Sequence, residues 1–232
     1  MPDMRFDVGR RPRWLRWLHR IGYVTTALIL AEILLVTVVA GREWYRHRQE
    51  RAKLIEQTRT HDSPWALNDD PYFREEARPL LSVMPSLADL HGNGLRFISM
   101  PALRGVRYGV VLWLPQPNAK QANGIFVMAD KQQDGAVTHQ RAFFMPARDF
   151  RALMHRIDIL TDGWAGDADG ICLDGNPVAF ERIRGTKITS GAGNCSSHYD
   201  RLKKLLYQAV QRFAPGKDLP GGPNWYPPDE SQ

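Results

Sequence analysis

One continuous apolar stretch near the N-terminus constrains this chain more than any other feature. Residues 21–40, IGYVTTALILAEILLVTVVA, run for 20 residues with a single charge, that of Glu32. A helix needs about 20 apolar residues to cross the hydrocarbon core of a bilayer. Aromatic and basic residues flank the stretch on both sides, in RPRWLRWLHR before it and REWYRHRQER after it, and such side chains favour the headgroup region. The sequence therefore predicts one transmembrane helix.

The positive charge of the chain lies in its first quarter. The 232 residues carry a formal net charge of +6. Residues 1–60 hold 12 basic and 6 acidic side chains, whereas residues 61–232 hold 19 of each. A protein that binds nucleic acid through the phosphate backbone needs a net basic surface. We therefore expect no nucleic-acid partner for the body of this protein.

The arrangement of leader, apolar stretch and body predicts a topology. Arginines and lysines flank both ends of the stretch, with six arginines in residues 1–20, so the positive-inside rule favours a cytoplasmic N-terminus only slightly. A short basic leader, one span and a long neutral body are typical of a signal anchor. For a bacterial source, this predicts an inner-membrane protein with a periplasmic C-terminal domain. Cleavage after Ala40 is the alternative, although the apolar stretch is longer than usual for a signal peptide.

The acidic residue inside the span is a candidate interaction site. Glu32 is the twelfth residue of the stretch, about 17 Å along a helix and close to the bilayer midplane. An acidic side chain costs on the order of 2–3 kcal/mol there on insertion scales. Ala27 and Ala31 form a small-xxx-small pair beside it, which suits close helix packing. These three residues predict a contact with a second copy or a membrane partner; alternatively, Glu32 is protonated and has no partner.

The remainder of the chain divides by composition. Residues 41–60 have paired charges at helical spacing and predict a solvated helical stalk. Residues 61–95 contain four prolines and predict a linker, residues 96–213 a globular domain, and residues 214–232 a disordered proline-rich tail.

The globular domain is predicted to have an α+β fold, a small antiparallel sheet packed with two helices. Short runs rich in β-branched and aromatic residues predict strands. We expect a first hairpin turn at Asp134-Gly135 and a second at 174–176. Apolar residues at helical spacing follow Pro146 and again follow Ser197, where Asp200 completes a capping pattern. The strands are too closely spaced for the helical crossovers that parallel sheets require.

The two cysteines of the chain, Cys172 and Cys195, predict a disulfide if the domain lies in an oxidising compartment. Closing the loop between them would stabilise the fold by about 3 kcal/mol in the chain-entropy model. The alternative is an exported or anchored hydrolase. In it, His198 acts as the base for Cys195 or a neighbouring serine, and Asp200 orients the imidazole.

A second weak candidate site is a set of four aspartates in TDGWAGDADGICLDG. Asp162, Asp167, Asp169 and Asp174 supply oxygen ligands that calcium prefers, but their spacing does not match an EF-hand loop. Turns rich in Gly and Asp need no metal. We therefore expect no metal or cofactor. The leading interpretation is a non-enzymatic envelope protein that is anchored in the lipid bilayer and acts through a protein partner or a second copy.

Overall fold

The computed structural model describes residues 13–64, 71–101, 105–130, 137–168 and 175–228. The chain separates at residue 51 into two units, residues 1–51 and residues 52–232.

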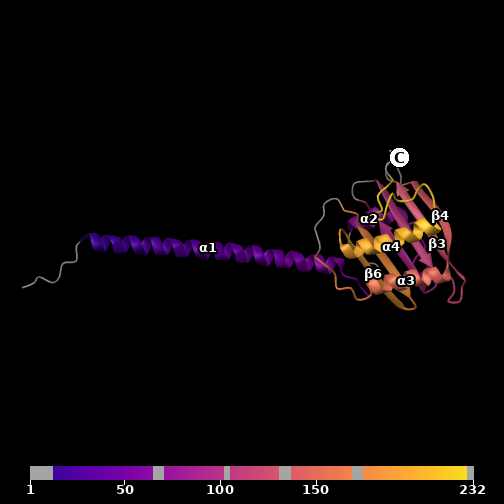
Figure 1. Ribbon diagram of the computed structural model, residues 1–232, viewed down its shortest axis with the longest axis horizontal. Helices are drawn as coiled ribbons and strands as arrows, with labels where there is room; N and C mark the ends of the chain where they lie inside the picture. Colours follow the sequence, from indigo (N-terminus) through magenta and orange to yellow (C-terminus); the bar gives the residue numbers. More distant parts are fainter. Residues whose placement is uncertain (1–12, 65–70, 102–104, 131–136, 169–174, 229–232) are drawn as a thin grey trace, which may run out of the picture. The chain divides into compact units, whose positions relative to one another are not determined.

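The described part of the first unit is helical. Helix α1, Arg13–Thr58, begins before the apolar stretch and continues without interruption through the predicted stalk (Figure 1). Within the described residues it is the one helix long and apolar enough to span a membrane. The Thr25 and Thr37 hydroxyls donate to carbonyls one turn back, those of Ile21 and Ile33. These hydroxyls therefore need no water, which suits a helix inside a bilayer.

The second unit is built on a six-stranded antiparallel sheet with the strand order β4-β3-β2-β1-β5-β6. The bounds of its strands are β1 Asn93–Ser99, β2 Val106–Trp113, β3 Gln121–Asp130, β4 Val137–Pro146, β5 Val178–Arg184 and β6 Lys187–Gly193. The first four strands form a meander, and β5 then pairs with the free side of β1. The predicted α+β class with an antiparallel sheet is confirmed.

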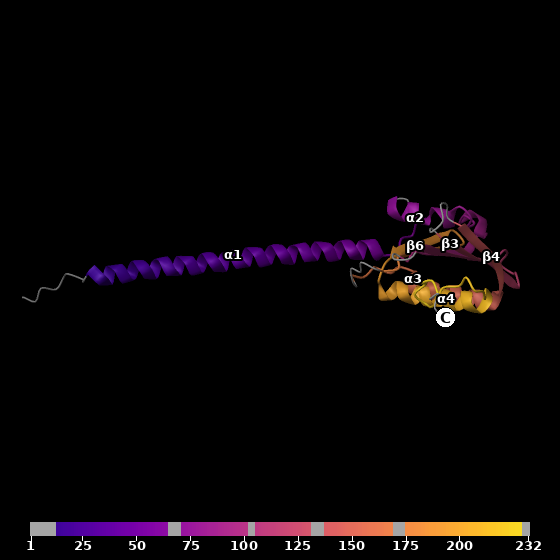
Figure 2. The same cartoon turned by 90° about the horizontal axis from the view of Figure 1, so that it is seen from above.

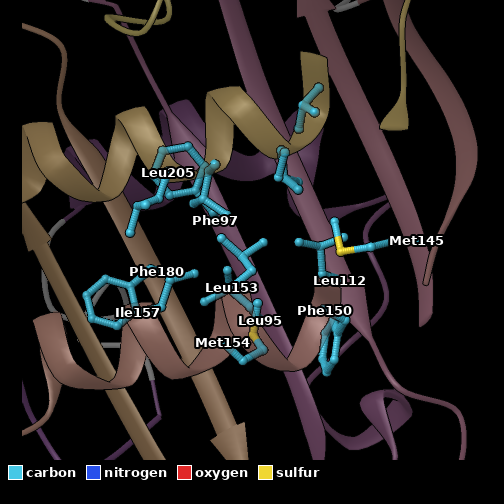
Figure 3. Close-up of a cluster of buried hydrophobic side chains, with 14 of the residues drawn as sticks. Leu95, Phe97, Leu112, Met145, Phe150, Leu153, Met154, Ile157, Phe180 and Leu205 are labelled. Carbon is cyan, nitrogen blue, oxygen red and sulfur yellow. The ribbon is translucent and has the colours of Figure 1, made fainter. Parts of the chain in front are cut away.

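Two helices cover one face of the sheet, as the helical spacing predicted. Helix α3, Ala147–Thr161, and helix α4, Ser197–Phe213, lie side by side across it (Figure 1). Their apolar side chains pack against those of the central strands (Figure 3). The labelled members of this core are Leu95, Phe97, Leu112, Met145, Phe150, Leu153, Met154, Ile157, Phe180 and Leu205.

A third layer covers the opposite face, where the sequence predicted a linker. Helix α2, Pro71–Leu81, and the short 3-10 helix η2, Ala88–Leu90, lie on this side (Figure 2). Ala77, Leu80 and Met84 are buried against the strands there. The segment therefore belongs to the domain. The sequence indicated only one helical turn here, at 73–77, because the prolines interrupt the helical pattern.

One predicted hairpin is confirmed and the other is displaced. Strands β3 and β4 pair from Gln121 opposite Pro146 to Asp130 opposite Val137; the predicted turn at Asp134-Gly135 lies outside the described residues. Strand β5 pairs with β1 on one side and β6 on the other. Its hairpin turn is therefore at Gly185, which has a positive φ of 62°, and not at 174–176.

The described part of the C-terminal tail is docked on the domain, which corrects the prediction of a disordered tail. Trp225 is fully buried, with ring centroids 5.0 Å from Phe97 and 6.0 Å from Tyr108. Its indole N–H donates to the Lys203 carbonyl at 2.9 Å. A single aromatic side chain, with its polar group satisfied, therefore anchors a segment that has no periodic pattern.

Candidate functional site

Helix α4 begins one residue earlier than predicted. Ser196, and not Ser197, is the N-cap residue, and its Oγ accepts a hydrogen bond from the His198 backbone N–H at 3.2 Å. The same hydroxyl donates to Asp167 Oδ2 at 2.7 Å. Asp200 forms an ion pair with Lys203 at 2.6 Å. Serine and aspartate here therefore stabilise the start of the helix.

His198 packs against a tryptophan and is not joined to a nucleophile. Its imidazole stacks on Trp164 with ring centroids 3.7 Å apart and planes 2° from parallel. Within the described residues, its Nε2 is buried without a hydrogen-bond partner. No hydrogen bond there joins the imidazole to a serine, cysteine or aspartate side chain. The structure therefore does not assemble the base, nucleophile and orienting carboxylate that the hydrolase alternative requires.

The environment of His198 lowers the pKa of its imidazole below the usual value near 6.5. Burial is the main cause, and the positive charge of Arg201 acts in the same direction, while Asp167 and a hydrogen bond with the Leu160 backbone oppose the shift. The unfolded chain then binds a proton at a higher pH than the folded protein does. His198 consequently lowers the free energy of unfolding as the pH falls below about 6.5.

Replacing His198 with phenylalanine is expected to reduce the loss of stability between pH 7 and pH 5. Phenylalanine keeps a flat ring against Trp164 but cannot be protonated. The measurement is the free energy of unfolding of the full chain in detergent, at several pH values, for both proteins. Identical pH profiles would show that His198 does not contribute to this dependence.

Of the two cysteines in the predicted disulfide, the structure describes only Cys195. Cys195 lies between β6 and the cap of α4, with a φ of 55° that is uncommon for a residue other than glycine. Cys172 lies outside the described residues. The pairing of the two cysteines therefore remains a prediction.

The aspartates proposed as calcium ligands are bound by protein groups where they are described. Asp162 accepts hydrogen bonds from Arg184 and Thr189 and pairs with Lys187. Burial alone would raise the pKa of its carboxyl, but the hydrogen bonds from these three residues lower it below the usual value. Asp167 is bonded to Ser196 as above. Asp169 and Asp174 lie outside the described residues, and the described part of the chain holds no cluster of three metal-binding side chains.

Helix α1 contains the three residues that were predicted to form a contact inside the membrane. Ala27, Ala31 and Glu32 all lie within this helix with exposed side chains. Ala27 and Ala31 are four residues apart and share one face. Their role as a contact surface remains a prediction.

A groove between α3 and α4 was not predicted from the sequence. It has a volume of about 880 Å³. The C-terminal half of α3 faces the N-terminal half of α4 across it, so the two helices run antiparallel. Its apolar lining is Ile159, Leu160, Trp164 and Leu205, and its basic lining is Arg156, Arg201 and Lys204, with His198 and Gln208 completing it.

The cations of this groove are not neutralised by the described protein. Arg156, Arg201 and Lys204 form no ion pair with any described residue, whereas the acidic side chains of α3 and α4 are all paired. Those pairs are Asp149 with Arg148, Asp158 with Arg182 and Arg184, and Asp200 with Lys203. The outward face of the two helices therefore combines exposed apolar surface with unpaired positive charge. Basic residues at the polar positions of two amphipathic helices were the signal for it in the sequence.

The last turn of α1 is bonded to the segment that follows α3 and to the first turn of α4. The Thr58 hydroxyl donates to the Asp167 carbonyl at 2.9 Å, and the Tyr199 hydroxyl donates to the Thr58 carbonyl at 2.7 Å. The Thr60 N–H donates to the Trp164 carbonyl at 3.1 Å. Gly166 lies so close to Ile55 that a Cβ atom would be 2.1 Å from the Ile55 carbonyl oxygen. Trp164 thus contributes to both the groove and the stalk attachment.

Comparisons of the chain with protein-family models, with curated proteins and with solved structures found no match.

Proposed function

We propose that this protein is a single-pass membrane protein whose C-terminal domain acts through contacts with other proteins. The observation that carries this proposal is the groove between α3 and α4. It combines an apolar lining with arginines, and protein interfaces are enriched in arginine and have apolar centres. Helix α1 supports the membrane attachment because it is long and apolar enough to span a bilayer.

The proposed topology places the N-terminus in the cytoplasm and the domain in the periplasm of a bacterial cell. The basic leader and the neutral body of the sequence support this orientation. Ala27, Ala31 and Glu32 would offer a second contact, inside the membrane, to another copy or a partner helix. In the periplasm, a bond between Cys172 and Cys195 would tie the start of α4 to the segment before β5.

Thiol labelling tests the topology. In the full-length protein from intact cells, denatured before labelling, we expect maleimide to label Cys172 and Cys195 only after reduction. A Cys172→Ser variant is expected to lose about 3 kcal/mol of stability in the chain-entropy model. Labelling of both thiols without prior reduction would contradict both the disulfide and the exported position of the domain.

Photo-crosslinking in membranes tests the proposed protein contact. A photoreactive amino acid at Gln208 would face the groove without removing a cation or an apolar side chain from it. We expect an adduct with a protein from this position. The matched control is the same amino acid at Glu75, an exposed residue of α2 on the other side of the sheet, where we expect no adduct. Equal adducts from both positions, or none from Gln208, would contradict the proposed function.

A further inference from the structure

We propose that the groove between α3 and α4 binds an acidic, amphipathic segment of a partner protein. This inference rests on the proposed function and names the chemistry of the partner. It follows from the apolar lining, the distribution of charge over the domain and the length of the groove.

The apolar part of the groove is accessible. Ile159, in the last turn of α3, is 71% exposed, although Phe150, Leu153, Met154 and Ile157 of the same helix are buried. Leu160 and Leu205 line the groove beside it. A ligand that is only charged would leave these apolar side chains exposed to water. An occupant that contributes apolar side chains removes it from water and gains about 25 cal/mol for each Å² buried.

The two helices that border the groove carry an excess of positive charge. Helices α3 and α4 together hold seven basic and three acidic residues, although residues 61–232 as a whole are neutral. The remainder of the domain therefore carries the compensating negative charge. The guanidinium groups of Arg156 and Arg201 match the geometry of carboxylates, which they can bind through two parallel hydrogen bonds. Charge complementarity thus favours an acidic partner and disfavours a basic one.

The groove extends along both helices. A second hollow of about 230 Å³ continues along the two helices toward Met145 and Phe213. It shares Arg156, Leu205 and Gln208 with the first hollow. An elongated groove between two helices suits a helix whose apolar residues recur every three or four positions, with carboxylates on either side of them.

Charge reversal tests the acidic character of the partner. The full-length protein with the photoreactive amino acid at Gln208 would be combined with R156E and R201E, and separately with R156Q and R201Q. We expect the adduct yield to fall about tenfold for the glutamate pair, because its negative charges repel an acidic segment. For the glutamine pair we expect a fall of about threefold, because the attraction is only removed. The matched control is R74E with R78E, which makes the same change of net charge on exposed residues of α2 and should leave the yield unchanged.

Mass spectrometry of the adduct identifies the occupant. We expect the captured segment to carry net negative charge and apolar residues at helical spacing. A basic or neutral segment, or a yield that both pairs of substitutions leave unchanged, would overturn this inference while the proposed function stands. An adduct with lipid or with a second copy of this chain would also overturn it. Failure of the position at Gln208 to capture any protein would overturn the proposed function as well.

Discussion

Replacing Trp225 with alanine is expected to lower the free energy of unfolding by about 3–5 kcal/mol, the usual cost of removing a buried tryptophan. The indole is fully buried among Phe97, Tyr108 and Tyr207. Its removal would leave a cavity in the main core and would abolish the hydrogen bond from the indole to the Lys203 carbonyl. Chemical denaturation of the full chain in detergent measures the effect.

The neighbouring residue provides the control for this substitution. Tyr226 is 36% exposed, so Tyr226→Ala is expected to cost less than about 1 kcal/mol. The variant at Trp225 should also expose the chain after Pro215 to proteases, because the indole anchors that segment. If the stability and the protease resistance of the Trp225 variant equal those of the unaltered protein, the tail does not contribute to the core.

Replacing Asp158 with alanine is also expected to lower the free energy of unfolding by about 3–5 kcal/mol. The reason is that the buried Arg182 guanidinium loses its carboxylate partner. Asp158 on α3 accepts a hydrogen bond from Arg182 Nε on β5 at 2.9 Å. The Arg182 side chain is only 4% exposed, and burial lowers the pKa of its guanidinium even though Asp158 opposes that shift. Denaturation of the full chain measures the loss.

Two further variants separate the buried charge from other effects. Asp149→Ala removes a carboxylate from the same helix, but its ion pair with the exposed Arg148 is long, at 3.9 Å, so we expect a change below about 1 kcal/mol. Combining Asp158→Leu with Arg182→Met should restore part of the stability, since a buried ion pair can be replaced by apolar groups. A double variant as unstable as Asp158→Ala would show that the unpaired charge is not the cause.

The elements that the sequence predicted best are those whose pattern is local. The apolar stretch of α1 and the helical spacing of Phe150, Leu153, Met154 and Ile157 in α3 can be recognised without knowing their surroundings. The β3–β4 hairpin likewise follows from two runs of strand-forming residues separated by Asp134-Gly135.

The third layer was missed although the sequence contains a signal for it. Strand β2 is buried at six consecutive positions, from Arg107 to Leu112, and such continuous burial requires cover on both faces of a sheet. The run RYGVVLWL was interpreted only as a strand. Of the helix that provides the second cover, α2, the sequence indicated only one turn, because Pro71 and Pro79 are more typical of a linker.

At the candidate catalytic residues, sequence proximity was misleading. His198 and Asp200 are two positions apart on α4, but neighbours at this spacing point in different directions on a helix. The imidazole turns to Trp164 and the carboxylate to Lys203. The basic residues of the groove could be seen in the sequence, but the groove itself could not, because α3 and α4 meet only when both pack on the same face of the sheet.

Local patterns are therefore sufficient for the long apolar helix, the strands and the two large amphipathic helices, since hydrophobic periodicity acts over a few neighbouring residues. The burial of α2 and Trp225, the pairing of β5 with β1, and the unpaired cations beside Ile159 depend on contacts between distant parts of the chain. Such contacts are selected by the shape and free surface of the assembled sheet, which no short segment contains. Tertiary structure alone thus created the groove to which we assign the function.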